Sequence, residues 1–219
     1  MPKDVYKRQD IKGLLIFVHG MGGGHLSYTT EINYFANQGF LVFAYDNTGT
    51  MLSDGKRLNG FEQSIIDLQA ALQYIDADTT LRQYPKVLVG HSWGAYSVCN
   101  ITRFYNDIKG IVAISAFCKP SQILCQLTQT QTHKKLFFLA PFFHMVSWLR
   151  FRKRSNANVI TALRQSKIPT LLFHGELDTT VPLSCSPLAH ATQLKKQPNI
   201  SLILCKNRYH CLLYTSRCV

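Results

Sequence analysis

The chain has 219 residues, of which 46% are hydrophobic and 16% charged, enough apolar material to form the core of a single domain. Lys and Arg number 24 against 12 Asp and Glu, but the basic residues form no aromatic-interleaved motif, so we expect no nucleic-acid partner. The seven cysteines are scattered without C-x-x-C pairs, which argues against a disulfide framework and a zinc site and favours a cytoplasmic location.

Apolar runs and helical periodicity alternate along the chain. The runs predict strands at about 14–18, 40–45, 86–90, 110–115, 169–174 and 200–204. The stretches between them predict helices over 27–38, 61–76, 93–105 and 184–196. This alternation indicates an α/β fold with a mostly parallel central sheet and helices on both faces.

The first predicted strand ends in a glycine-rich loop, His19-Gly20-Met21, followed by three more glycines. Glycines allow the backbone of such a loop to approach a ligand closely. We expect the Met21 N–H, directly after the His-Gly pair, to be one donor of an oxyanion hole. The alternative is a dinucleotide-binding loop with Asp46 as ribose partner, but His25 occupies the third glycine position of that motif.

The third predicted strand runs into Gly90-His91-Ser92-Trp93-Gly94, a Gly-x-Ser-x-Gly sequence followed by a helix. That context is typical of a nucleophile elbow, in which a strained turn lifts the serine hydroxyl above the sheet. The two glycines prevent a collision between strand and helix. Ser92 is therefore the predicted nucleophile and Trp93 the second oxyanion-hole donor, whereas we expect the His91 side chain to point away from the catalytic groups.

Residues 119–167 interrupt the alternation and predict a cap over the active site. Their centre, residues 136–149, is apolar and flanked by basic residues, but it is too short and proline-interrupted to span a bilayer. Core-facing cap helices, a lid lining an acyl pocket and weak contact with an anionic membrane surface all remain open. Phe142, Phe143 and Trp148 are the candidate substrate-pocket residues.

Two further polar residues follow the last two predicted strands, in the chain order that accompanies a nucleophile elbow: Ser, then acid, then His. Asp178 follows the strand at 169–174, and His210 follows the strand at 200–204. His210 would be the general base and Asp178 would orient its ring. Glu176 is the competing candidate for the acid.

Together these motifs resemble the α/β-hydrolase superfamily, and most closely its serine aminopeptidase and esterase-like branch. The resemblance rests on His19-Gly20, the 46–55 loop, the elbow, the 174–182 segment and His210. It implies a Ser92–Asp178–His210 triad and an oxyanion hole formed by Met21 and Trp93. The expected function is a serine hydrolase that cleaves a small-molecule carboxylic ester, or a short peptide or amide, without metal or cofactor. An acyltransferase with the same triad and a non-catalytic binding protein on the same fold are the alternatives; oligomeric state is not indicated.

Both ends of the chain resemble the translation of a sequencing adaptor. This applies to residues 1–9 and 211–219, so we expect 10–210 to form a single domain that is truncated at both ends. The second junction would supply one base of codon 210, which leaves His or Gln as its original residue.

Overall fold

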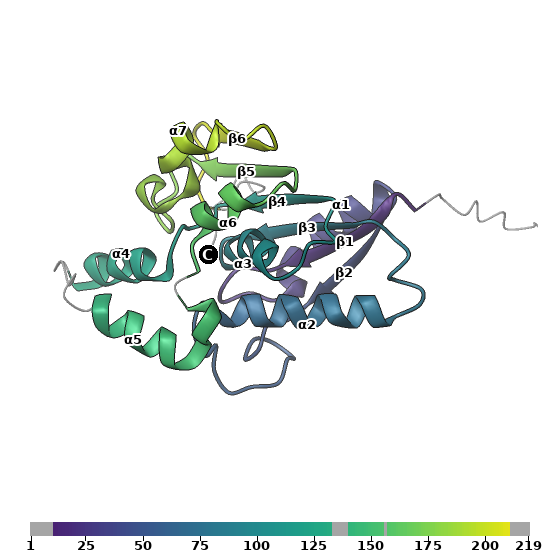
Figure 1. Cartoon of the computed structure of the whole chain (residues 1–219), viewed down its shortest axis with the longest axis horizontal. Coiled ribbons are helices and arrows are strands. Elements are labelled where there is room, and N and C mark those ends of the chain that lie inside the picture. Colours follow the sequence, from purple (N-terminus) through teal and green to yellow (C-terminus); the bar gives the residue numbers. More distant parts are fainter. Residues whose placement is uncertain (1–10, 133–139, 156, 211–219) are drawn as a thin grey trace, which may run out of the picture.

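The computed structural model describes residues 11–132, 140–155 and 157–210, which form one parallel sheet flanked by helices (Figure 1). The sheet order is β2-β1-β3-β4-β5-β6. The strands are β1 (Gly13–Val18), β2 (Phe40–Tyr45), β3 (Lys86–His91), β4 (Gly110–Ile114), β5 (Thr170–Gly175) and β6 (Ile200–Cys205). Each predicted strand is confirmed with boundaries within one residue, as is the α/β fold with a parallel sheet.

The helices follow the strands in alternation. The α-helices are α1 (Thr29–Asn37), α2 (Gln63–Ala77), α3 (Trp93–Asn100), α4 (Pro120–Thr132), α5 (Ala140–Phe151), α6 (Val159–Gln165) and α7 (Ala191–Leu194). Short 3-10 helices are η1 (His25–Tyr28), η2 (Ile101–Arg103), η4 (Arg152–Arg154), η5 (Leu183–Cys185) and η6 (Pro187–His190).

The single helix predicted over 184–196 is wrong, because η5, η6 and α7 occupy this stretch as separate short turns. Pro187 is the physical reason. It has no N–H to donate inside a helix, and its ring is compatible only with the first turn. Here it starts η6, where the Ser186 side chain accepts a hydrogen bond from the Leu188 N–H.

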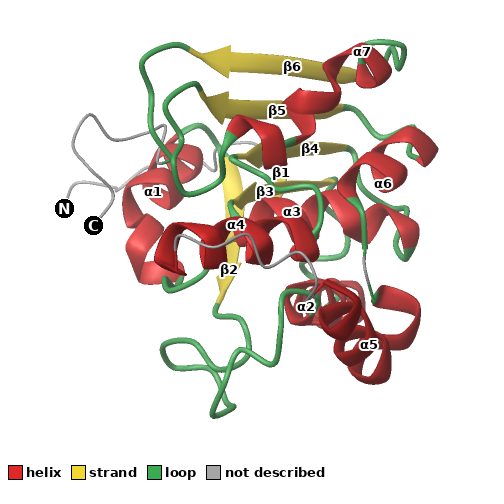
Figure 2. Cartoon of the chain, turned by 90° about the vertical axis from the view of Figure 1, so that its left-hand side faces the viewer, coloured by secondary structure: helices red, strands yellow, loops and turns green. Residues whose placement is uncertain are grey.

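Successive side chains of β1 pack alternately against the helices on the two faces of the sheet. Leu14, Ile16 and Val18 face the larger core, to which α2, α3 and α6 contribute. Leu15 and Phe17 point to the opposite face and pack with partly buried side chains of α1. In Figure 2, α1 lies on one side of the sheet and α2 and α3 on the other. The alternation along β1 follows from the two-residue period of a strand, and it explains why the run is apolar throughout.

The strand order reverses at β1, because β2 lies on one side of it and β3 to β6 continue on the other. Loops that leave the carboxyl ends of β1 and β3 therefore diverge, and ligands bind in such a crevice in open α/β sheets. The glycine-rich loop and Ser92 both follow these two strands. The topology thus puts the predicted oxyanion loop and the predicted nucleophile at one place.

Helices α4 and α5 lie beyond the carboxyl ends of the strands (Figure 1), and in Figure 2 α4 crosses in front of the sheet. Helix α6 instead packs on α3, with Val159, Ala162 and Leu163 buried. Among the described helices, none is long and apolar enough to cross a bilayer. The segment that projects over the site is thus the α4–α5 pair.

We expect the contact between α3 and the end of β1 to tolerate no added methyl group. A Cβ at Gly94 would overlap the backbone carbonyl of Val18, whereas a Cβ at Gly110 would meet nothing nearer than 3.8 Å. Gly94→Ala should lower the free energy of unfolding by at least about 3 kcal/mol, because neither backbone can move away. Gly110→Ala is the matched control and should change it by less than about 1 kcal/mol. Urea unfolding measures both, and equal midpoints would contradict the packing described here.

Candidate active site

Ser92 occupies a strained turn between β3 and α3. Its backbone has φ 54° and ψ −110°, a conformation that costs a non-glycine residue of the order of 1–3 kcal/mol. Two hydrogen bonds fix the turn: the Ser92 N–H donates to the Ile114 carbonyl at 2.8 Å, and the Tyr96 N–H donates to the Ser92 carbonyl at 3.0 Å. Within the described part of the chain the hydroxyl makes no hydrogen bond, and the residue is partly exposed.

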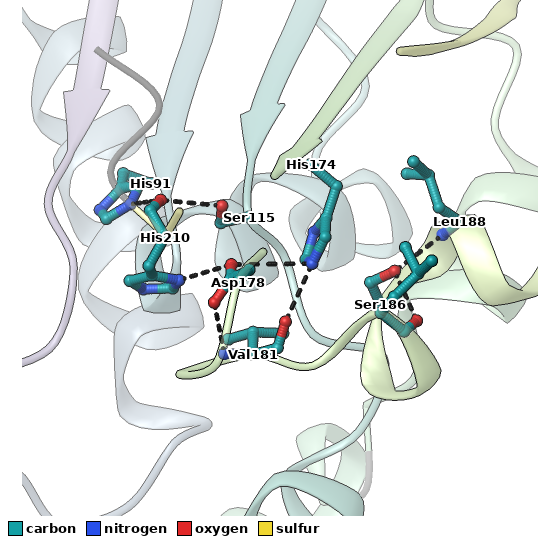
Figure 3. Close-up of polar contacts among 9 residues, drawn as sticks. His91, Ser115, His174, Asp178, Val181, Ser186, Leu188 and His210 are labelled. Atoms are coloured by element: carbon teal, nitrogen blue, oxygen red, sulfur yellow. Dashed lines mark hydrogen bonds and ion pairs between the residues drawn. The ribbon is translucent and has the colours of Figure 1, made fainter. Parts of the chain in front are cut away.

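Asp178 and His210 form a hydrogen-bonded pair at the ends of β5 and β6 (Figure 3). His210 Nδ1 lies 2.8 Å from Asp178 Oδ2, and the Val181 N–H donates to Asp178 Oδ1 at 2.8 Å. Burial by itself would raise the pKa of the Asp178 carboxyl, but the His210 ring and the Val181 N–H outweigh it and lower that pKa. The carboxylate is therefore ionised and oriented toward the ring.

His174 supports the turn that carries Asp178. Its Nε2–H donates to the Val181 carbonyl at 2.9 Å and lies 3.6 Å from Asp178 Oδ2. Burial lowers the pKa of His174, so the ring is neutral near pH 7 and adds no charge beside the carboxylate. The competing acid, Glu176, instead accepts a hydrogen bond from the Asn207 N–H at 3.1 Å. Of the two candidates, it is Asp178 that pairs with His210.

The backbone of His210 is held by two side chains from the neighbouring strand ends. Its carbonyl accepts hydrogen bonds from Ser115 Oγ at 2.9 Å and from His91 Nε2 at 3.1 Å. The rings of His91 and His210 are 4.8 Å apart. The expectation that His91 points away from the catalytic groups is therefore wrong, because its ring follows β3 into the crevice and fixes the predicted base.

A second hydrogen bond of His91 leads to the glycine-rich loop. Because Nε2 donates to His210, Nδ1 is the acceptor, and the Tyr28 hydroxyl donates to it at 2.7 Å. The same hydroxyl accepts from the Gly20 N–H at 3.0 Å. A Cβ on Gly20 would lie 3.4 Å from Ser92 Cβ, so this loop lies beside the predicted nucleophile.

The two predicted oxyanion-hole residues occupy different kinds of position. Met21 follows Gly20 in a turn and has a half-exposed side chain. Trp93 is the first residue of α3, where a backbone N–H has no acceptor within the helix. Its own ring is buried and donates to the Phe61 carbonyl at 2.7 Å.

Buried His19 links the glycine-rich loop to Asn47 through two hydrogen bonds. Its Nε2 accepts from the Asn47 N–H at 2.9 Å, so its Nδ1–H donates to the Gly20 carbonyl at 2.8 Å. Burial lowers the pKa of His19 and keeps the ring neutral in this tautomer. The Gly20 carbonyl and the Met21 N–H belong to one planar trans peptide and point in opposite directions. The hydrogen bond to the carbonyl therefore also fixes the direction of the Met21 N–H.

Of the three predicted pocket residues, two line one cavity. Phe142 and Phe143 of α5 contribute to a cavity of about 220 Å³. Trp148 lies outside it, half-exposed, with the Arg152 guanidinium 4.6 Å from its ring centre. The described residues contain no cluster of three or more His, Cys, Asp or Glu that could hold a metal ion.

Residues 9–162 match the family model of serine aminopeptidases S33. The chain belongs to this α/β-hydrolase family. An esterase of Pyrococcus furiosus has a TM-score of 0.72 at 18% identity, over 92% of this chain and 75% of that one. Est1E of Butyrivibrio proteoclasticus, with ferulic acid bound, has a TM-score of 0.69 at 20% identity, over 98% of this chain and 86% of that one.

A monoacylglycerol lipase of Paleococcus ferrophilus gives a TM-score of 0.60 at 20% identity, over 92% of this chain and 87% of that one. No curated protein matches the sequence significantly. The structural similarities confirm the expected α/β-hydrolase fold.

The buried, neutral His91 predicts a specific loss of stability in acid. Its pKa is lowered from 6.5 to about 4, by burial first and then by the neighbouring His210. The unfolded chain therefore binds more protons than the folded one between these pH values. The stability that this difference provides is fully present above pH 6.5 and is lost as the pH falls toward 4.

His91→Gln isolates this contribution, because glutamine can still donate to the His210 carbonyl and accept from Tyr28 but does not titrate. Between pH 7 and pH 4 the wild type should lose roughly 3 kcal/mol more of its free energy of unfolding than the variant. His19 and His174 are present in both proteins and cancel in the comparison. Parallel urea curves for the two proteins at every pH would show that His91 is not buried in its neutral form.

Proposed function

We propose that the protein is a serine carboxylesterase in which Ser92, His210 and Asp178 act as the catalytic triad. The observation that carries the proposal is the Asp178–His210 hydrogen bond of 2.8 Å at the edge of the sheet from which the strained Ser92 turn projects. An oriented imidazole at the same sheet edge as a partly exposed serine on a positive-φ turn is consistent with the arrangement that acyl transfer requires. Membership of a serine hydrolase family supports the same assignment.

The reaction begins with proton transfer from the Ser92 hydroxyl to His210 Nε2, while the serine oxygen forms a bond to the ester carbonyl carbon. The negative charge that develops on the carbonyl oxygen is stabilised by the N–H groups of Met21 and Trp93. The ionised Asp178 stabilises the imidazolium. The bond to the alcohol then breaks, and His210 returns its proton to the leaving oxygen.

Water completes the cycle in the same site. His210 removes a proton from the water as its oxygen attacks the acyl-enzyme, and the serine oxygen leaves with that proton. The neighbours named as esterases and as a monoacylglycerol lipase favour an ester over a peptide substrate. The apolar wall formed by Phe142 and Phe143 favours an apolar acyl group.

Fluorophosphonate labelling followed by intact-mass measurement tests the nucleophile. The wild type should gain one adduct, and Ser92→Ala should gain none while keeping the same circular dichroism spectrum. Ser97→Ala is the matched control, since Ser97 lies on the buried face of α3 and donates to the Gly94 carbonyl. An adduct that persists in Ser92→Ala would place the reactive serine elsewhere.

The two candidate acids can be separated by isosteric amides. Asp178→Asn should reduce kcat for p-nitrophenyl butyrate by about 10³- to 10⁴-fold, because the amide favours the wrong tautomer of His210. Glu176→Gln should change kcat by less than about threefold, since the Glu176 carboxylate contacts a backbone N–H of the β6 loop rather than the base. Equal losses in the two variants would contradict the assignment of Asp178.

A further inference from the structure

A second cavity, of about 460 Å³, adjoins the apolar one. It is lined by Lys56, Arg57, Asn59, Gly60 and Arg150, so that three of its five lining residues are cationic and none is acidic. Asn59, Gly60 and Arg150 also line the smaller cavity, which makes the two spaces neighbours. The loop before α2 and the helix α5 therefore border an open basic cavity next to an apolar one.

The cations of the larger cavity are not neutralised within the protein. Among the described residues, Lys56, Arg57 and Arg150 form no ion pair with a carboxylate. Arg150 donates to the Asn59 carbonyl at 3.1 Å, a contact that orients the guanidinium without cancelling its charge. Three uncompensated cations around one concave space raise the local concentration of anions.

The loop that carries two of these cations is anchored to α2. The Thr48 N–H and hydroxyl both donate to the Asp67 carboxylate, each at 2.8 Å, and the Gly49 N–H donates to the Asp54 carbonyl at 2.9 Å. The Arg57 backbone packs against Gly49 so closely that a Cβ there would collide with it. An anchored loop loses less conformational entropy on binding than a free one.

The smaller cavity has the opposite character. Its wall is mainly apolar: Phe61, Leu124, Phe142, Phe143, Val146 and Phe151. Its one acidic residue, Glu62, is buried and accepts a hydrogen bond from Ser147 Oγ at 2.6 Å. The smaller cavity thus has one carboxylate and one cation, Arg150, whereas the larger has three cations and no carboxylate, so a negatively charged group is directed to the larger one.

We propose that the two cavities form one bipartite site for an amphiphilic anion. An apolar chain occupies the smaller cavity, and a carboxylate or phosphate head receives charge-assisted hydrogen bonds from Lys56, Arg57 and Arg150. The Phe61 carbonyl accepts from the ring of Trp93, the residue after Ser92, which ties the apolar wall to the elbow. Given the esterase function proposed above, the inference narrows the substrate to esters that carry a negative charge.

Binding tests the site without turnover. Octanoate and octyl phosphate are titrated calorimetrically into Ser92→Ala. The control ligands are octanol, which lacks the anionic head, and inorganic phosphate, which lacks the apolar chain. Both amphiphiles should bind, and the paired change Lys56→Gln with Arg57→Gln should weaken them about tenfold or more at low salt. The matched control is Lys195→Gln with Lys196→Gln, two cations of the α7 end that should leave affinity unchanged. Arg150→Gln should weaken binding as the loop variant does.

Turnover identifies which half of the ester bears the charge. One pair compares p-nitrophenyl octanoate with the mono-p-nitrophenyl ester of suberic acid, and a second compares octanoylglycerol with octanoylglycerol phosphate. In the wild type the anionic member of one pair should have a kcat/KM about tenfold higher, and the loop variant should remove this preference. The first pair reports an acyl-chain carboxylate and the second an alcohol-side phosphate.

The outcomes separate this inference from the esterase assignment. Hydrolysis of neutral and anionic esters at equal rates, with no binding of either amphiphile, overturns the bipartite site and leaves the esterase assignment intact. If the fluorophosphonate does not label the wild type, but the amphiphiles still bind in an Arg57-dependent way, the esterase assignment alone is overturned. Binding to phosphatidylserine vesicles without binding of the monomeric amphiphiles would also overturn the proposal, since the cations would then face a membrane surface.

Discussion

The close crossing of β1 and α3 is the constraint from which the active-site geometry follows. At Gly94 the helix backbone lies directly against the Val18 carbonyl, and there is no space for a side chain between them. This approach forces the single-residue connection between β3 and α3 into a sharp turn and holds that residue, Ser92, at positive φ. It also fixes the distance between the start of α3 and the loop after β1, which are the two sources of predicted oxyanion donors.

The predicted base is positioned by hydrogen bonds to its backbone carbonyl rather than by the predicted nucleophile. The His210 carbonyl is held by Ser115 and His91, and His91 continues through Tyr28 to the Gly20 N–H. The predicted base and the glycine-rich loop are thus connected by a series of hydrogen bonds that does not include Ser92. Because burial keeps His91 neutral at neutral pH, each group in this series of hydrogen bonds has one fixed role as donor or acceptor.

The sequence was sufficient for features whose cause is local. All six strands could be predicted because buried parallel strands are uninterrupted apolar runs, and the elbow could be predicted because its glycines and serine are adjacent. The pairing of Asp178 with His210 was predicted from their order after successive strands, and their side chains lie within hydrogen-bond distance. The helix expected over 184–196 is absent because Pro187 divides the stretch, since proline lacks the N–H that a continuous helix needs at that position.

Features that depend on tertiary contacts had no comparable signal. Nothing in the sequence around Tyr28 or Ser115 distinguishes these hydroxyls, since their partners lie 63 and 95 residues away. Arg57 and Arg150 are 93 positions apart and become neighbours only when α5 folds back on the loop before α2 (150 − 57). Trp148 was grouped with Phe142 and Phe143 on composition, but its position on α5 places it outside their cavity.

The placement of α4 and α5 separates two tasks within the molecule. The predicted chemistry depends on residues that follow β1, β3, β5 and β6, whereas both cap helices belong to the single connection between β4 and α6. Helix α6 then rejoins the core layer on α3, so the connection leaves and re-enters the framework at fixed points. A different insertion could replace α4 and α5 between those points without moving Ser92, Asp178 or His210. This connection is therefore the part of the fold where a new substrate preference would cost the least free energy of unfolding.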